Sequence, residues 1–323
     1  MNNKIKTTIC NIVKSATPRA LSTIWWILRI TTLVSFIMFV LKYTGILNWI
    51  SALVSPLFQY FGLPGDAAMA YVSGYFINVY SAIAVISTLE FTAREITILG
   101  TMVLAAHAMF IETALQHKTG SPSAYVFILR TIGSIFLGVI LNLLLPGRPE
   151  ITATGALSLA GIPFFDIQGH LGLMFWDWFK GMAKLAVMMF CLIYTLNIIQ
   201  RTLYELGIME IISRILRPLL RVFGLADSTS FIWIVANVSG ISYGAAAILD
   251  ELDRGKITTR EINLLNTHIG ISHSNLEDLT LLTSVGGACG VMLLARWALV
   301  IILVWALRLY YHLKDKRRKL QTA

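Results

Sequence analysis

The sequence predicts an all-α integral membrane protein made of two repeats inserted in opposite orientations. Three observations support this fold class. First, 56% of the 323 residues are hydrophobic and only 13% are charged, and the mean hydropathy is +0.72, which soluble domains of this size do not show. Second, the carboxyl-terminal half repeats the amino-terminal half. Third, a segment of one repeat is rich in Arg residues whereas the matching segment of the other repeat has no Lys or Arg, which indicates that the two segments lie on opposite sides of a membrane.

Composition also excludes other classes of protein. The formal net charge is +9, but Lys and Arg residues flank apolar runs and form no single basic face, so nucleic acid is not an expected partner. The three cysteines, Cys10, Cys191 and Cys289, have no short pair spacing. Neither a disulfide framework nor a cysteine-rich zinc site is therefore predicted.

Apolar stretches close to the roughly 20 residues needed to cross a bilayer recur along the chain. The basic amino terminus precedes the first stretch without a small-residue cleavage site, which favours an uncleaved first crossing. Membrane lipid is therefore an expected partner. The five clearest stretches are Thr23–Leu41, Ile96–Leu115, Ala124–Leu145, Leu185–Ile199 and Val291–Leu307.

An internal repeat emerges from the residue numbers. An offset of 166 maps Val72-Ser73-Gly74 onto Val238-Ser239-Gly240 and continues without a gap to the last apolar helix. Upstream of Pro64 the offset becomes 162 and maps Phe61-Gly62-Leu63 onto Phe223-Gly224-Leu225. Such agreement at a fixed offset is the signature of a duplicated unit. The polar and charged pairs related by 166 include Thr92 with Thr258, His107 with His273, Glu112 with Asp278, and Arg130 with Arg296.

Each repeat is expected to contain a crossing, a short amphipathic helix, a Gly/Ser-interrupted segment and two further apolar helices, in that order. The motifs Thr92-x-x-Glu95 and Thr258-x-x-Glu261 are capping boxes, and each predicts the start of a helix that continues past Glu112 or Asp278. The amphipathic helices are predicted at Leu47–Phe61 and Met209–Phe223, and the interrupted segments at Ala67–Thr88 and Ser230–Leu252.

The distribution of Lys and Arg residues favours an inverted topology. The first amphipathic helix has none, whereas its counterpart carries Arg214, Arg217 and Arg221 in one stripe, so the two helices are expected on opposite faces of the membrane. Opposite orientation requires an odd number of crossings per repeat. Three crossings result if each interrupted segment is a re-entrant helical hairpin, with its tip near residues 73–78 or 237–242. The alternative is a parallel duplication with four crossings per repeat.

The inverted topology assigns every flanking charge to a side. Re-entrant tips are tolerated at membrane depth where protein or water surrounds them, so they are expected to line a substrate site. The predicted organisation is a basic cytoplasmic amino terminus at 1–19, a first repeat at 20–146, a linker with an interfacial segment at 147–181, a second repeat at 182–313 and a basic cytoplasmic tail at 314–323. Both termini are expected in the cytoplasm with Lys118, Arg201, Arg214, Arg217, Arg221, Arg254, Lys256 and Arg260, and the outer side is expected to hold Lys42, Arg94, Arg148, Lys180 and Lys184.

Several motifs resemble a known membrane domain. Asn78-x-Tyr80-Ser81-Ala82, Arg94-Glu95-Ile96 followed by His107, and the run from Ser272 to Asp278 are similar to the nucleoside-recognition or Gate domain. The resemblance extends from about residue 20 to residue 313 and looks like two Gate units in one chain, as in a fusion of spore maturation proteins A and B. More distantly, the chain resembles the membrane domain of ferrous iron transporter B and concentrative nucleoside transporters.

The resemblance implies a multi-pass protein of the bacterial cytoplasmic (inner) membrane. There is no GTPase domain and no cysteine at matching positions in both repeats, so iron uptake is not favoured. A nucleoside is implied only by analogy, because a fold does not determine its substrate.

Ionisable side chains within crossings are the first candidates for function, because burying them in a bilayer costs several kcal/mol. Glu112 and Asp278 are candidates, and the alternative is that they lie solvated near an interface. His107 and His273 are candidates near the middle of their helices. His273 and Glu277 are four residues apart, so on a helix they would share a face and could relay a proton. Without a converging third ligand, no metal or cofactor is predicted.

Arginines and neutral polar side chains complete the candidate substrate-binding site. Arg130 and Arg296 are expected either to form ion pairs with Glu112 and Asp278, respectively, or to contact an anionic substrate. The neutral side chains suit a polar solute, or alternatively serve only the turns at the hairpin tips. These neutral candidates are Ser73, Asn78, Ser81, Asn237, Ser239, Ser242 and Asn275.

The leading functional hypothesis is a secondary transporter that moves a small polar solute or ion by alternating access of the two repeats. The alternatives are a non-transporting scaffold or accessory factor of the spore-maturation type, and a divalent metal transporter. An enzyme is not predicted, because the sequence shows no nucleophile–base pair or zinc motif. Homo-oligomers are an additional expectation.

Overall fold

The chain folds into α-helices, with no strand among the residues that the structure describes. The structure is a computed structural model, and it describes residues 2–147, 166–167 and 169–322. The predicted all-α class is confirmed. Within these residues five helical stretches are long and apolar enough to cross a membrane, one of them made of two successive helices, and each overlaps one predicted stretch. They are Ala20–Tyr43, Ala93–Lys118, Ser123–Leu144, Leu171–Glu205 and Cys289–Arg317.

The elements of the two halves follow one another in the same order. The first half contains α1 (Asn2–Tyr43), α2 (Ile46–Phe58), the 3₁₀ helix η1 (Gln59–Phe61), α3 (Ala67–Phe76), α4 (Val79–Ile86), α5 (Ala93–Ala106), α6 (Met109–Lys118) and α7 (Ser123–Leu144). The second half contains α8 (Leu171–Glu205), α9 (Ile208–Ile215), α10 (Arg217–Val222), the 3₁₀ helix η2 (Asp227–Thr229), α11 (Ser230–Ser239), α12 (Ile241–Asp253), α13 (Thr259–Ile271), α14 (Asp278–Ser284) and α15 (Cys289–Thr322).

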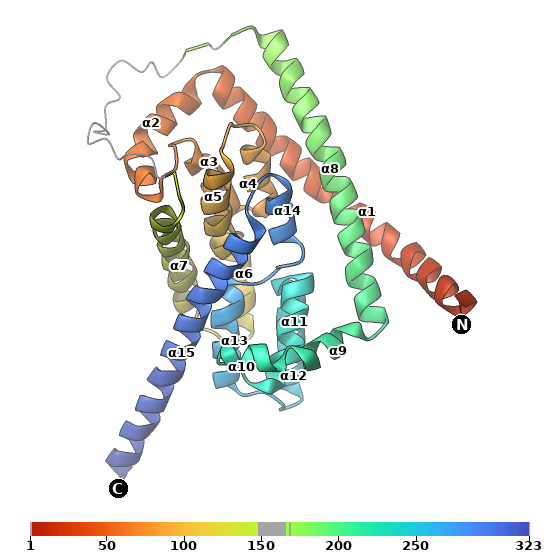
Figure 1. The fold of residues 1–323 in the computed structure, drawn as a ribbon, viewed down its shortest axis with the longest axis vertical. Helices are drawn as coiled ribbons and strands as arrows, with labels where there is room; N and C mark the ends of the chain where they lie inside the picture. The colour runs from red at the N-terminus through yellow and green to blue at the C-terminus, as the bar shows by residue number, and fades with distance from the viewer. Residues whose placement is uncertain (1, 148–165, 168, 323) are drawn as a thin grey trace.

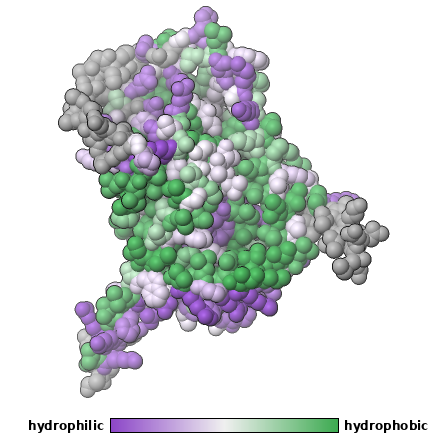
Figure 2. Space-filling view, in the orientation of Figure 1, coloured by the Kyte–Doolittle hydropathy of each residue, from purple (hydrophilic) through white to green (hydrophobic). Residues whose placement is uncertain are grey.

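Two pairs of equivalent helices run in opposite directions. Figure 1 shows α1 and α8 side by side and antiparallel, and α7 and α15 also run oppositely. The amphipathic helix α2 lies at one end of the molecule, whereas its counterparts α9 and α10 lie at the other. Figure 2 shows a hydrophobic band between two more polar ends. A band of this kind is expected where a protein contacts lipid.

The two halves share one interior. The largest cluster of buried apolar side chains combines Leu99 and Met102 of α5 with Leu282 of α14 and Met292 of α15. Helix α15 packs against α5, and α13 packs against α7. Because each half covers the central helices of the other, a residue at the end of α5 or α13 lies close to the opposite half.

The predicted capping boxes are both present. Thr92 accepts a hydrogen bond from the amide of Glu95, whose carboxylate accepts one from the Thr92 amide at 2.7 Å. Thr258 and Glu261 repeat this exchange, with the return hydrogen bond at 2.8 Å. These reciprocal bonds satisfy amide groups that a helix start otherwise leaves unpaired.

Both Gly/Ser-interrupted segments form helical hairpins, α3–α4 and α11–α12, and their turns fall within the predicted tips. Glycines allow the arms to approach closely: a Cβ atom at Gly74 would lie 3.1 Å from Cβ of Ala82, and one at Gly244 would lie 2.7 Å from Cβ of Ala236. Gly240, with φ of 87°, forms the second turn. A positive φ there favours glycine.

The helices that begin at the capping boxes are not continuous, contrary to the prediction. Helix α5 ends at Ala106 and α6 begins at Met109, whereas α13 ends at Ile271 and α14 begins only at Asp278. Ala108 has φ of 44° and Ser274 has φ of 50°, and these are the non-glycine residues with positive φ in the described part of the chain. They are related by the offset of 166. Each such residue costs about 1–2 kcal/mol, and such strain concentrates at functional sites.

Two predicted segment boundaries, at residues 19 and 181, fall inside continuous helices. Helix α8 runs without interruption from Leu171 to Glu205, so it crosses the expected end of the linker at residue 181. Helix α1 likewise continues across residue 19. Most of the predicted linker, including Arg148, lies outside the described residues.

The predicted cationic stripe on the second amphipathic element is exposed. Arg214, Arg217 and Arg221 lie at the surface of α9 and α10. Hydrogen bonds from Arg221 to Asp227, one of them 2.6 Å long, hold the pKa of the Asp227 carboxyl below its usual value. This pair lies outside the five crossings, in α10 and η2, and Figure 1 shows α10 at the opposite end of the molecule from α2.

Candidate functional site

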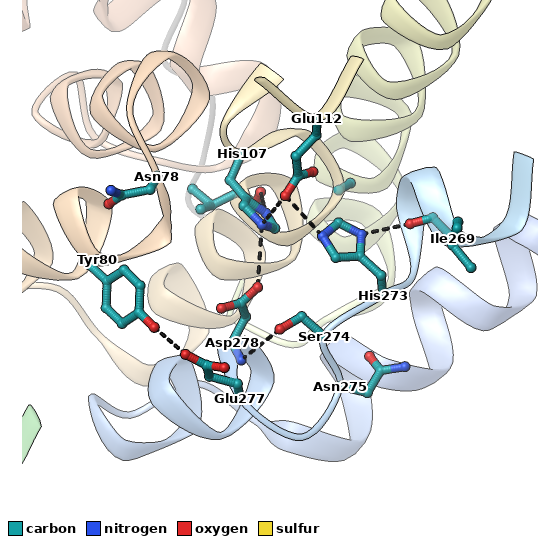
Figure 3. Close-up of polar contacts among 12 residues, drawn as sticks. Asn78, Tyr80, His107, Glu112, Ile269, His273, Ser274, Asn275, Glu277 and Asp278 are labelled. Carbon is teal, nitrogen blue, oxygen red and sulfur yellow. Dashed lines mark hydrogen bonds and ion pairs between the residues drawn. The ribbon is translucent and has the colours of Figure 1, made fainter. Parts of the chain in front are cut away.

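The helix breaks of the two halves meet, and four ionisable side chains are in contact there (Figure 3). The rings of His107 and His273 have centroids 5.0 Å apart. Oε1 of Glu112 lies 3.2 Å from Nε2 of both histidines, and Oδ2 of Asp278 lies 3.3 Å from Nε2 of His107. The four residues are at most 7% exposed. We call them the junction cluster.

The backbone determines which ring nitrogen of each histidine faces the carboxylates. Nδ1 of His107 lies 3.2 Å from the carbonyl oxygen of Val103, and Nδ1 of His273 lies 2.6 Å from that of Ile269. A carbonyl oxygen only accepts hydrogen bonds, so each Nδ1 carries the proton and donates it. A neutral ring therefore directs the lone pair of Nε2 at a carboxylate oxygen. Two acceptors at such a distance require a proton or a metal cation between them.

Arg130 holds the first helix break and Glu112 together. Its guanidinium is fully buried and lies 2.6 Å from Oε2 of Glu112. It also donates hydrogen bonds to the carbonyl oxygens of Ala105 and His107, at 3.1 and 2.8 Å. The predicted ion pair between Arg130 and Glu112 is present. Because Arg130 occupies one carboxylate oxygen, the other is left for the two histidines.

The predicted ion pair between Arg296 and Asp278 is wrong. Arg296 donates to Oδ1 of Asn275 at 2.6 Å and to the carbonyl oxygen of His273 at 3.4 Å, whereas Asp278 faces His107. The second break spans residues 272–277 and the first only residues 107–108. Asp278 is consequently the first residue of its helix, whereas Glu112 is the fourth residue of α6, and the two carboxylates point differently.

Glu277 does not share a helix face with His273, as the sequence suggested, because residues 272–277 are not helical. Its carboxylate instead accepts a hydrogen bond from the hydroxyl of Tyr80 and one from Nε2 of Gln200 at 3.3 Å. Sequence reasoning did not select Tyr80 or Gln200 as site residues. Tyr80 lies within the Asn78-x-Tyr80-Ser81 motif and so carried a signal, whereas Gln200 carried none beyond being polar in an apolar helix.

The hairpin residues divide into two groups. Asn237 supports the second break, because its side chain accepts a hydrogen bond from Asn275 and its carbonyl oxygen accepts one from the amide of Leu276 at 3.1 Å. Asn78 instead caps α4 by accepting from the amide of Ser81 at 2.9 Å, and Figure 3 shows it beside the junction cluster without a contact to it. Ser73 donates to the Ala70 carbonyl, Ser239 lies in a groove described below, and Ser242 is exposed.

A groove of about 610 Å³ lies between α8, α11 and α12. Gln200 lines the groove and also donates a hydrogen bond to Glu277, the residue next to Asp278, so its side chain lies between the groove and Glu277. Its wall includes charged and polar side chains as well as apolar ones. The polar lining residues are Asn197, Gln200, Arg201, Tyr204, Ser239, Tyr243 and Asp250.

Residues 24–122 match the family model described as Nucleoside recognition, the Gate domain. The resemblance to the Gate domain is confirmed for these residues. The chain is also 25% identical over 285 residues to an uncharacterised membrane protein, YvoD, of Bacillus subtilis (strain 168), covering 88% of this chain and 90% of that protein. No solved structure matches the chain significantly.

The Gate match covers the first half of the junction cluster. It extends from within α1 to Pro122, immediately before α7, and therefore includes both His107 and Glu112. The contacts around the second break follow the same plan. The hydrogen bond from the amide of Glu112 to the Ala108 carbonyl, at 3.0 Å, has its counterpart between Asp278 and Ser274, also at 3.0 Å.

Proposed function

We propose that this protein is a secondary transporter that moves a small polar solute or ion across a bacterial cytoplasmic membrane, with both termini in the cytoplasm. The observation that carries the proposal is the junction cluster. Four buried ionisable side chains from two broken helices meet in the interior of a membrane protein. Such groups cost several kcal/mol to bury in a bilayer and mark ion and substrate pathways. Broken helices at the interface between repeats are also where secondary transporters bind their substrates.

The arrangement of the two halves supports alternating access by inverted repeats. Two pairs of equivalent helices run in opposite directions (Figure 1), and α2 and α9–α10 lie at opposite ends. The helix breaks recur at the same offset, with Ala108 and Ser274 both in the left-handed region. If the halves are related by a twofold axis in the membrane plane, exchanging their conformations would expose the junction cluster to the other side.

The groove between α8, α11 and α12 is the proposed cytoplasmic access route. Arg201 and Asp250 lie at its wall, near the carboxyl ends of α8 and α12, and α8 leads directly into α9. Gln200 connects this groove to Glu277. A solute entering here would meet Glu277 first and Asp278 next.

The test is ligand binding to the purified full-length protein, detected as a shift in its melting temperature. Nucleosides, amino acids, short peptides, organic anions and divalent metal ions form the screen. A ligand that binds only the folded protein raises its melting temperature, and the rise should disappear in Glu112→Gln and in Asp278→Asn. Glu210→Gln, at an exposed position of α9, serves as the matched control. The proposal fails if no compound binds, or if binding is unchanged in both junction variants.

A further inference from the structure

We propose that the junction cluster is a binding site for one divalent transition-metal ion, with His107, His273, Glu112 and Asp278 as its ligands. The proposal deepens the proposed function by naming a class of cargo, and it rests on that function only where the bound ion is said to be transported. Binding itself is independent of transport.

The distances between the side chains match those of metal ligands. Nitrogen and oxygen ligands lie about 2.0–2.2 Å from a zinc ion, so neighbouring ligands of a tetrahedral site are about 3.3 Å apart. The three contacts in the junction cluster are 3.2, 3.2 and 3.3 Å. The ligand atoms of His107, Glu112 and His273 all lie within 4.8 Å of one another. Few side chains would need to move to admit an ion.

The outer contacts of the ligands are those of a metal site. Metal-binding histidines typically donate the other ring N–H to a carbonyl or carboxylate, which holds the ring in place. Both histidines do so, to the carbonyl oxygens of Val103 and Ile269. The second oxygen of Glu112, Oε2, is paired with Arg130. These contacts orient the donor atoms before an ion arrives.

The number of donors favours a metal ion over a proton as the occupant. A shared proton joins two atoms, but here one carboxylate oxygen faces two imidazole lone pairs, and a second carboxylate faces one of them. Three donor atoms lie within 4.8 Å of one another, and Asp278 adds a fourth at 3.3 Å from His107, which is more than one shared proton uses. Two imidazoles with two carboxylates suit Zn²⁺, Fe²⁺ or Mn²⁺, whereas Mg²⁺ and Ca²⁺ prefer ligand sets made of oxygen alone.

Metal binding is measured on full-length protein purified in detergent and stripped with a chelator. Zn²⁺ and Mn²⁺ are the probes, Mg²⁺ is the negative control, and metal content after equilibrium dialysis gives the stoichiometry. We expect one Zn²⁺ per chain. Co²⁺ substitution should give the intense visible absorption of a four-coordinate ion, a signal that loosely bound surface ions do not produce.

Variants locate the bound ion. His107→Gln, His273→Gln and Glu112→Gln should each weaken Zn²⁺ binding by at least about 100-fold, because even outer-shell changes cost about 10–100-fold. The double variant His117→Gln/His312→Gln removes two exposed histidines and should bind normally. Size-exclusion chromatography shows which variants fold, and Glu112→Gln, which preserves side-chain shape, keeps the test valid if a histidine variant does not.

The outcomes separate the metal site from transport. The metal site is overturned if Zn²⁺ binds the folded junction variants as tightly as the wild type, or if only the surface double variant loses binding, which would show an adventitious ion only. Zn²⁺ binding without Zn²⁺ uptake by proteoliposomes upholds the site and contradicts the ion as cargo. Uptake of an organic solute by a protein that binds no metal overturns the metal site and supports the proposed transporter.

Discussion

His107 and His273, which are 166 positions apart in the sequence, direct Nε2 at the same oxygen of Glu112, each from 3.2 Å. Each ring is fixed by a hydrogen bond from Nδ1 to the carbonyl four residues earlier. The contact joins the two halves at the points where their helices break. Its duplicated geometry allows the following predictions.

The first prediction concerns the strained residues at the breaks. Ala108→Gly should raise stability by about 0.5–1 kcal/mol, because glycine removes a left-handed penalty of about 1–2 kcal/mol at the cost of some chain entropy. Ser274→Gly should act in the same direction. Ala106→Gly, at the last helical position of α5, is the control and should lower stability. Melting temperatures in detergent measure all three, and a loss of stability in Ala108→Gly would contradict the strain.

A second prediction tests the close approach of the arms in the α11–α12 hairpin. Gly244→Ala should destabilise by about 1–3 kcal/mol through overpacking, because the added Cβ would lie 2.7 Å from that of Ala236. Gly290→Ala is the matched control, since no atom lies within 4 Å of its added Cβ, and it should stay within about 0.5 kcal/mol of the wild type. Equal effects in thermal unfolding would show that the hairpin arms are not packed this closely.

A third prediction addresses the hydrogen bond between Tyr80 and Glu277. Tyr80→Phe should cost about 1–3 kcal/mol, because a half-buried carboxylate loses a donor. Tyr243→Phe, at an exposed tyrosine in the groove, should have little effect on thermal unfolding. If Tyr80→Phe leaves stability unchanged, water or another group replaces the hydroxyl and the predicted contribution of this hydrogen bond is contradicted.

The pattern of the sequence predicted the five apolar stretches, the hairpins and the capping boxes, because these depend on local signals. Hydrophobic stretches, Gly/Ser interruptions and the Thr-x-x-Glu motif each determine nearby backbone. The repeat offset of 166 also identified two pairs of candidate residues, Glu112 with Asp278 and His107 with His273. The ion pair of Glu112 with Arg130 followed from these pairs.

The helix breaks were missed because no proline or glycine marks them. Ala108 and Ser274 adopt positive φ without the residue type that favours it, so tertiary contacts impose the conformation. Hydrogen bonds from their amides to the carbonyls of Gly74 and Ala236 join each break to a hairpin, both at 3.0 Å. If the break is not recognised, helical spacing places Glu277 beside His273, whereas in the structure Glu277 contacts Tyr80.

A fourth prediction concerns topology. In a background without Cys10, Cys191 and Cys289, single cysteines at Gln59 and Arg221 should react with impermeant reagents from opposite sides of the membrane. This expectation is motivated by the arginine stripe, which α9–α10 carries and α2 lacks. Helix α2, which Gln59 directly follows, and α9–α10 lie at opposite ends of the molecule. Reaction of both cysteines from the same side would contradict the inverted repeats.

The most direct test of the account is uptake by proteoliposomes of whichever compound the binding screen identifies. Wild-type protein should accumulate it, Glu210→Gln should do so at a similar rate, and Glu112→Gln and Asp278→Asn should lose uptake while remaining folded. This result is expected because the two carboxylates are needed to bind the solute or its coupling ion in the interior. Accumulation that persists in both folded junction variants would contradict the claim that transport passes through the junction cluster.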